Sequence, residues 1–121
     1  METAKKALTD EAIAIRQKLI EAAAKGNKLF YSDLAIAGDD RHMNKLSIVL
    51  SKISRYEWKN GRPLLSSIVV NKEDDKSKAL PGAGFFILCA DLRTNDTLDE
   101  LQSACFSFWK DEKNKGKYKL I

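Results

Sequence analysis

The chain has 121 residues, of which 44% are hydrophobic and 31% are charged, and its formal net charge is +4. This length predicts one domain with one core, and the composition excludes wholesale disorder and a fibrous repeat. No apolar run approaches the roughly 20 residues of a membrane span, and residues 1–12 lack the apolar stretch of a secretory signal. We therefore expect a protein with no membrane partner, in the cytoplasm of a bacterial or phage-infected host cell.

The charge is unevenly distributed along the chain. Residues 1–40 carry a net charge of −1 and residues 63–109 carry −3. Residues 41–62 contain six basic residues and one acidic residue, and residues 110–121 contain five and two. Concentrated positive charge favours a polyanionic partner more strongly than the small total does. The internal segment is therefore the first candidate for binding nucleic acid.

The first predicted helix spans residues 9–25. Thr9 is a suitable N-cap, apolar residues recur after it at helical spacing, and Gly26 is suited to end the helix. A short β-type run at residues 29–31 follows. A two-turn helix is then predicted for residues 32–37.

A longer helix is predicted for residues 41–58, and it is amphipathic. Its apolar and basic residues fall on opposite sides of a helix with 100° between successive residues. One face is expected to pack against the core, while the other carries a cationic stripe. The apolar residues are Met43, Leu46, Leu50 and Ile53, and the basic residues are Arg41, Lys45, Lys52, Arg55 and Lys59.

The segment "GRPLLSSIVV", residues 61–70, predicts an abrupt change from helix to strand. Gly61 suits the left-handed conformation that ends a helix, and Pro63 forbids its continuation. Residues 65–71 have the composition of a strand. The basic helix is therefore expected to lead directly into a β-strand.

The chain is then expected to return through a loop. Residues 71–84 are charged and rich in turn residues, which is typical of a hairpin tip or a flexible loop. Phe85 is predicted to end a returning strand. Residues 86–93 are apolar and are predicted to form a helix.

The last predicted helix begins with a capping box, T-x-x-E, at residues 97–100 and extends to about residue 113. The basic tail 114–121 lacks a helical pattern and is expected to be mobile. Cys89 and Cys105 both lie in apolar segments, which predicts buried free thiols.

This order of elements is that of a winged helix, in which a helix-turn-helix pair precedes a β-hairpin. We therefore predict one α+β domain over residues 1–121, winged-helix-like and mostly helical, with a small β-hairpin or sheet. Residues 32–37 would be the first helix of the pair, and residues 41–58 would be the recognition helix. Residues 72–78 would form the wing.

Three segments carry a resemblance to a known family: "YSDLA" at 31–35, "LLSSIVVNK" at 64–72 and "PGAGF" at 81–85. They resemble the DNA-binding half of alkylguanine DNA alkyltransferases and alkyltransferase-like proteins, where a Tyr-Gly-x-x-Ala segment precedes a helix and a Pro-Cys-His-Arg-Val-Val strand. Residues 64–67 are Leu-Leu-Ser-Ser, so the nucleophilic Cys and the His of that family are missing. The resemblance implies DNA binding without alkyl transfer. Residues 29–92 are also similar to a family of short, largely uncharacterised bacterial and phage proteins, which implies the architecture but no particular activity.

The predicted function is non-enzymatic binding of nucleic acid, namely duplex DNA, through the basic helix. Lys and Arg on one exposed face supply the phosphate contacts that dominate affinity, although a merely solvated helix face explains the same stripe. No catalytic residue, metal or cofactor is predicted. The alternative is a small protein–protein interaction module that uses surface aromatic residues and the loop 73–78. The candidate DNA-binding residues are Arg41, Asn44, Lys45, Lys52, Arg55, Lys59, Arg62 and Lys72.

Overall fold

The computed structural model describes residues 8–34, 40–75 and 78–120, with residues 40–44 described by their backbone alone. This part of the chain is mostly helical, with one small sheet, so the α+β class is confirmed. None of its helices has the length and hydropathy that a bilayer crossing needs. In chain order the elements are α1 (Asp10–Ala24), β1 (Leu29–Phe30), α2 (Tyr31–Leu34), α3 (Asp40–Lys59), the 3₁₀ helix η1 (Leu65–Ile68), β2 (Val69–Val70), α4 (Ala83–Leu92), α5 (Leu98–Lys110) and α6 (Glu112–Tyr118).

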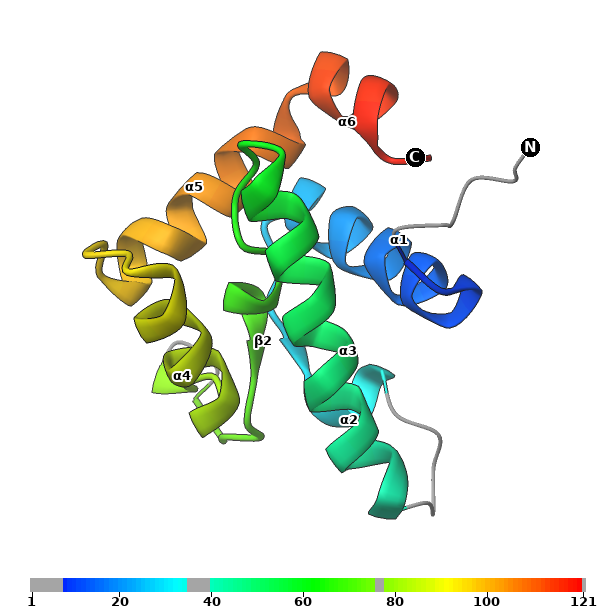
Figure 1. The fold of residues 1–121 in the computed structure, drawn as a ribbon. Helices are drawn as coiled ribbons and strands as arrows, with labels where there is room; N and C mark the ends of the chain where they lie inside the picture. The colour runs from blue at the N-terminus through cyan, green and yellow to red at the C-terminus, as the bar shows by residue number, and fades with distance from the viewer. Residues whose placement is uncertain (1–7, 35–39, 76–77, 121) are drawn as a thin grey trace.

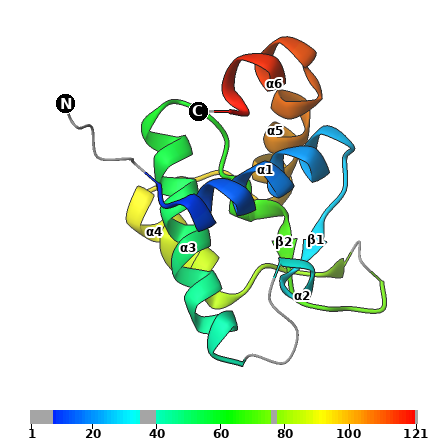
Figure 2. The same ribbon diagram turned by 90° about the vertical axis from the view of Figure 1, so that its right-hand side faces the viewer.

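The long helix α3 lies in the middle of the molecule. Figure 1 shows α1 on one side of it and α4 on the other, and the turned view in Figure 2 agrees. The helix α5 packs against α1, and α6 follows it. The segment η1 contacts α1, α3 and α5. It therefore lies where three helices converge, and it forms the centre of the core.

The residues of η1 are buried on every side. Leu65 and Ile68 are fully buried, and so is the hydroxyl-bearing Ser67. Ser66 is held by Ser54, whose Oγ lies 2.6 Å from the Ser66 Oγ and accepts a hydrogen bond of 3.0 Å from the Ser66 amide. The predicted strand over residues 65–71 is therefore wrong in its first half. A strand would place alternate side chains on opposite faces, whereas this segment turns so that all four side chains enter the core.

The two strands pair in parallel. Leu29 is in register with Val69, and Phe30 with Val70. Figure 2 shows the two strands next to each other below α1. Parallel strands need a long crossover connection, which α2 and α3 supply here. Among the described residues, β2 pairs with no later strand to make the predicted hairpin, although the Asn71 amide donates to the Leu80 carbonyl (2.9 Å) across the loop that follows.

The end of α3 has the geometry that the sequence predicts. Gly61 has a φ of +75°. Its amide donates to the Trp58 carbonyl (3.0 Å), and the amide of Arg62 donates to the Glu57 carbonyl (2.9 Å). This is the Schellman pattern of a glycine-terminated helix. Pro63 then leads the chain away from the helix axis and into the core segment.

The helix starts predicted from capping residues are also confirmed. The Thr9 hydroxyl accepts a hydrogen bond from the Ala12 amide (3.1 Å) at the start of α1. At the start of α5, Thr97 and Glu100 form the reciprocal capping box, with bonds of 2.8 and 3.2 Å. Both patterns are local in sequence, so they do not depend on tertiary packing.

Two predictions for the second half of the chain are wrong. Phe85 does not end a strand but lies in the first turn of α4, where its side chain is buried. Much of the tail lies in the helix α6, whose N-cap Asp111 accepts a hydrogen bond through its side chain from the Lys113 amide (2.9 Å). A lysine-rich helix has little apolar periodicity, so its formation depends on contacts with the rest of the fold.

Candidate nucleic-acid interface

The helix α3 separates an apolar face from a basic one. Its inner residues Leu46, Val49, Leu50 and Ile53 are buried in the main core. This packing fixes the rotation of the helix about its axis, so the opposite face must point outward. The described basic residues on this outer face are Lys45, Lys52, Arg55 and Lys59, and all four are exposed. We call these four residues the basic face.

Two members of the basic face have acidic neighbours. Lys45 Nζ lies 3.2 Å from Glu11 Oε2, and their side chains are 60% and 42% exposed. Arg55 Nη2 lies 2.8 Å from Asp91 Oδ2, and these side chains are also about half exposed. Exposed pairs of this kind contribute about 0–1 kcal/mol each. A phosphate could therefore replace either carboxylate at little cost.

Lys52 and Lys59 are the open positions of the basic face. Within the described ranges neither has a carboxylate in ion-pair contact. A shallow groove of 320 Å³ lies between α1 and α3, and Lys45, Lys52, Ile48 and Glu11 are among the residues that line it. The end of the basic face at Lys45 and Lys52 thus borders a groove that contains the carboxylate of Glu11, whereas Lys59 does not line this groove.

Other predicted site residues lie apart from the basic face or cannot be placed. Lys72 is exposed but follows β2, in the charged loop. Arg41 and Asn44 belong to α3 by their backbone, and their side chains lie outside the described residues. The basic face as defined above therefore does not include these two side chains at the N-terminal end of α3.

Arg62, predicted from the sequence to bind DNA, does not lie on the basic face. Its side chain is only 6% exposed, because it turns inward and donates to Glu57, with Nε 2.8 Å from Oε1. Its guanidinium also lies over the rings of Tyr56 and Tyr118, at 5.3 and 5.0 Å from their centroids. Burial alone would lower the pKa of Arg62, but the hydrogen bond and charge of Glu57 outweigh it and raise that pKa. Arg62 is therefore a charged part of the core.

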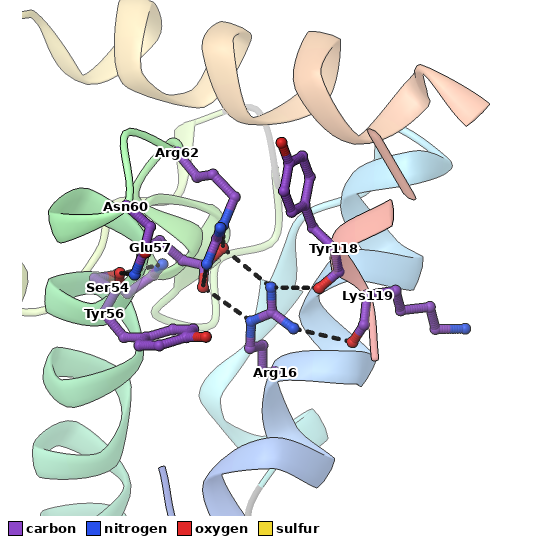
Figure 3. A network of polar contacts seen from close by, with 9 residues as sticks. Arg16, Ser54, Tyr56, Glu57, Asn60, Arg62, Tyr118 and Lys119 are labelled. Carbon is purple, nitrogen blue, oxygen red and sulfur yellow. Dashed lines mark hydrogen bonds and ion pairs between the residues drawn. The ribbon is translucent and has the colours of Figure 1, made fainter. Parts of the chain in front are cut away.

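Arg62 is one member of a buried polar network that joins three helices (Figure 3). Glu57 is fully buried and also accepts from Arg16 of α1, with Nε 2.9 Å from Oε2 and Nη2 3.3 Å from Oε1. Arg16 in turn donates to the carbonyls of Tyr118 (2.8 Å) and Lys119 (2.9 Å) at the end of α6. One carboxylate therefore binds two guanidinium groups, and one of these groups holds the C-terminal helix.

The sequence contains a signal for this network. Arg16 lies within the apolar stripe of α1, between the buried Ile15 and Leu19. Glu57 lies four residues after Ile53, on the inner side of α3. Charged residues on core-facing positions are rarely fully buried unless they are paired. The opposite charges of Arg16 and Glu57, on the core-facing sides of α1 and α3, were therefore the signal that these two side chains pair.

A second set of ion pairs fastens α6 to α1. Glu21 contacts the ammonium groups of Lys115 and Lys119, the latter at 3.0 Å. Hydrogen bonds from these two lysines lower the pKa of Glu21 from its ordinary value of 4.5 to about 2. The basic residues of the tail are thus partly used within the fold, and the net charge of residues 110–121 overstates the free positive charge there.

The described residues offer little for covalent or metal chemistry. Ser66 and Ser67 are both buried in η1. Cys105 is fully buried, and burial raises the pKa of its thiol to about 12, while the half-buried Cys89 is also a free thiol. Within the described ranges, no three His, Cys, Asp or Glu side chains gather as a metal site would require.

Comparisons with protein-family models, with curated proteins and with solved structures found no match for this chain. The basic face and its surroundings are therefore what the fold itself offers as a guide to function.

Proposed function

We propose that this protein is a non-enzymatic nucleic-acid-binding protein that contacts the phosphates of duplex DNA through the basic face of α3. The observation that supports the proposal is the distribution of charge on this helix. Four exposed basic residues lie along one side, whereas the described acid of α3, Glu57, is buried and paired. Among the side chains of α3 that the structure describes, the cations thus lie outward and the carboxylate lies inward.

The spacing of the basic face suits a polyanion. Lys45, Lys52 and Lys59 follow one another at intervals of seven residues, which corresponds to about 10 Å along the axis of a helix. The side chains therefore span about 21 Å, which is enough to contact several phosphates in succession. In this proposal α2 and α3 act as a helix-turn-helix pair, and the loop after β2 acts as the wing of a winged-helix-like arrangement.

The experiment compares two triple variants with the same loss of charge. In the first, Lys52, Arg55 and Lys59 are each changed to Gln, which leaves the apolar face of α3 intact. In the matched control, the exposed lysines Lys18, Lys25 and Lys113, which lie outside α3, are changed to Gln. Binding of a duplex oligonucleotide is measured by fluorescence anisotropy from 50 to 300 mM salt, in the range where phosphate contacts dominate affinity.

The first variant should bind about tenfold or more weakly at 50 mM salt. The slope of log affinity against log salt should flatten by roughly 2.7, at about 0.9 for each lost phosphate contact. The control should retain most of its affinity, because its lysines lie elsewhere. Equal losses in both variants would show attraction to net charge alone, and no binding by the parent protein at 50 mM salt would refute the proposal.

A second candidate function, a protein-interaction module, is favoured by one observation. A groove of 600 Å³ between the end of α3 and α5 is lined by Trp58, Pro63 and Phe108. Trp58 is 38% exposed there, and exposed aromatic residues beside a proline are typical of surfaces that bind peptides. If the parent protein does not bind DNA, this groove becomes the leading site for a partner.

A further inference from the structure

The helix α4 is apolar on all sides. Its sequence, AGFFILCADL, contains a single charged residue, Asp91. The inner side chains Phe85 and Leu88 are buried, and Phe85 packs in a cluster with Leu64 and Leu101. A helix that is apolar all round is normally buried all round. In this structure α4 is covered on only one side.

The uncovered side of α4 forms a continuous stripe. Ala83, Phe86, Ile87 and Ala90 are all exposed, with 45% of Phe86 and 63% of Ile87 open to solvent. The spacing of three, one and three residues puts them on one face, directly opposite Phe85 and Leu88. We call these four residues the α4 stripe. Leu80, just before the helix, is also exposed and extends the apolar surface.

We propose that the α4 stripe is the contact surface between two copies of this chain, which pack with their α4 helices antiparallel. The order of side chains in the stripe is small, large, large, small, and it reads the same in both directions. Around a twofold axis, Ala83 of one copy would face Ala90 of the second copy, and Phe86 would face Ile87. A surface that is complementary to itself under a twofold rotation is what an isologous dimer requires.

The charges at the ends of α4 support the same arrangement. Gly82 occupies the N-cap position, and among the described residues no side chain caps the first turn, in which the Phe85 amide donates to the Gly82 carbonyl (3.1 Å). Asp91 lies at the other end, with its side chain 54% exposed beside Arg55. In the antiparallel dimer, Asp91 of the second copy would face Gly82. A carboxylate near a helix N-terminus is stabilising, whereas a parallel pair would place the two Asp91 side chains together.

The size of the patch sets the expected strength. The exposed parts of Leu80, Phe86 and Ile87 amount to roughly 300 Å² per copy, against about 800 Å² per partner in a standard stable interface. The dimer is therefore weak, with a dissociation constant on the order of 10–100 μM. This association uses α4 and the proposed DNA contact uses α3, and the Arg55–Asp91 ion pair links the two surfaces.

Sedimentation equilibrium from 1 to 500 μM tests the proposal with two variants that differ only in position. Ile87→Lys places a charge in the α4 stripe, and Ile48→Lys makes the same change on α3, where Ile48 is 58% exposed. The parent and Ile48→Lys should dimerise with similar constants, whereas Ile87→Lys should stay monomeric. A parent that is monomeric at 500 μM, or an Ile87→Lys variant that dimerises like the parent, would overturn the proposal.

Folding and orientation need separate measurements. Circular dichroism checks that Ile87→Lys is folded. If Ile87→Lys does not fold, the milder variant Phe86→Ala is used instead, and it should weaken the dimer about tenfold. For orientation, Ala83→Cys and Ala90→Cys are made singly in a Cys89→Ser background. A mixture of the two should form a disulfide-linked heterodimer under mild oxidation, and neither alone should cross-link, since like positions lie beyond the roughly 7 Å reach of a disulfide. Cross-linking of the single variants alone would contradict the antiparallel arrangement.

Discussion

Replacement of Glu57 by Gln should be among the most damaging single changes in this protein. The change preserves the shape of the side chain and removes its charge, so that Arg16 and Arg62 lose the carboxylate that compensates them. Removal of one partner from a buried ion pair costs about 3–5 kcal/mol, because the remaining charge is left without compensation. A chain of 121 residues has a total stability of about 6–18 kcal/mol. The variant should therefore lose a large fraction of its stability.

Urea unfolding, followed by the fluorescence of the buried Trp109, measures this loss directly. Glu73→Gln is the matched control, since Glu73 is exposed and its replacement should change stability by less than about 0.5 kcal/mol. A loss below about 1 kcal/mol for Glu57→Gln would refute the view that this carboxylate compensates two buried cations. The combined variant Arg16→Met, Glu57→Leu and Arg62→Met should be more stable than Glu57→Gln by about 2 kcal/mol, because it removes every charge of the network together.

Two further predictions concern the end of α3 and the fastening of α6. Gly61→Ala should destabilise the protein by about 1 kcal/mol in the same urea assay, because Gly61 has a φ of +75° and not because space is lacking. The control Gly116→Ala, within α6, should be neutral or slightly stabilising. Equal effects of the two changes would contradict this explanation. The pKa of Glu21 is lowered to about 2 by hydrogen bonds from Lys115 and Lys119, so its contribution to stability is present above pH 4.5 and is lost as the pH falls toward 2. The contribution is no more than about 1 kcal/mol, because the carboxylate is 42% exposed. Glu21→Gln should remove this part of the pH dependence of stability. If the stability of Glu21→Gln depends on acidic pH as that of the parent does, the pairing is refuted.

Local signals in the sequence predicted the helices well where the necessary interactions are local. The caps at Thr9 and Thr97 and the Schellman end at Gly61 each depend on a few neighbouring residues, so the pattern and the structure agree. The apolar periodicity of α3 likewise predicted which of its faces would pack. The same reasoning could not distinguish a strand from a buried 3₁₀ helix at Leu65–Ile68, because both are short apolar runs.

The remaining errors arise from contacts between distant residues. The helix α6 is held by Arg16, which precedes its carbonyl partners by 102 and 103 positions, and lysine-rich composition alone gives no sign of such a contact. Counting cations along residues 41–62 put Arg62 among the DNA-binding candidates, because a count could not show that its guanidinium pairs with the buried Glu57. Of the candidate site, the sequence identified the outward cations of α3, but it could not reveal their acidic neighbours Glu11 and Asp91.

The bond between Arg16 and the end of α6 has a consequence for how the protein folds during synthesis. Translation proceeds from the N-terminus at about 5–20 residues per second, so the guanidinium of Arg16 waits several seconds before Tyr118 and Lys119 have been made. Until then α1 lacks its contact with the end of α6, and the guanidinium of Arg16 is only partly satisfied. The nascent chain therefore cannot complete its core gradually. Its packing is completed only after α6 has left the ribosome, in a step that joins residues 102 and 103 positions apart.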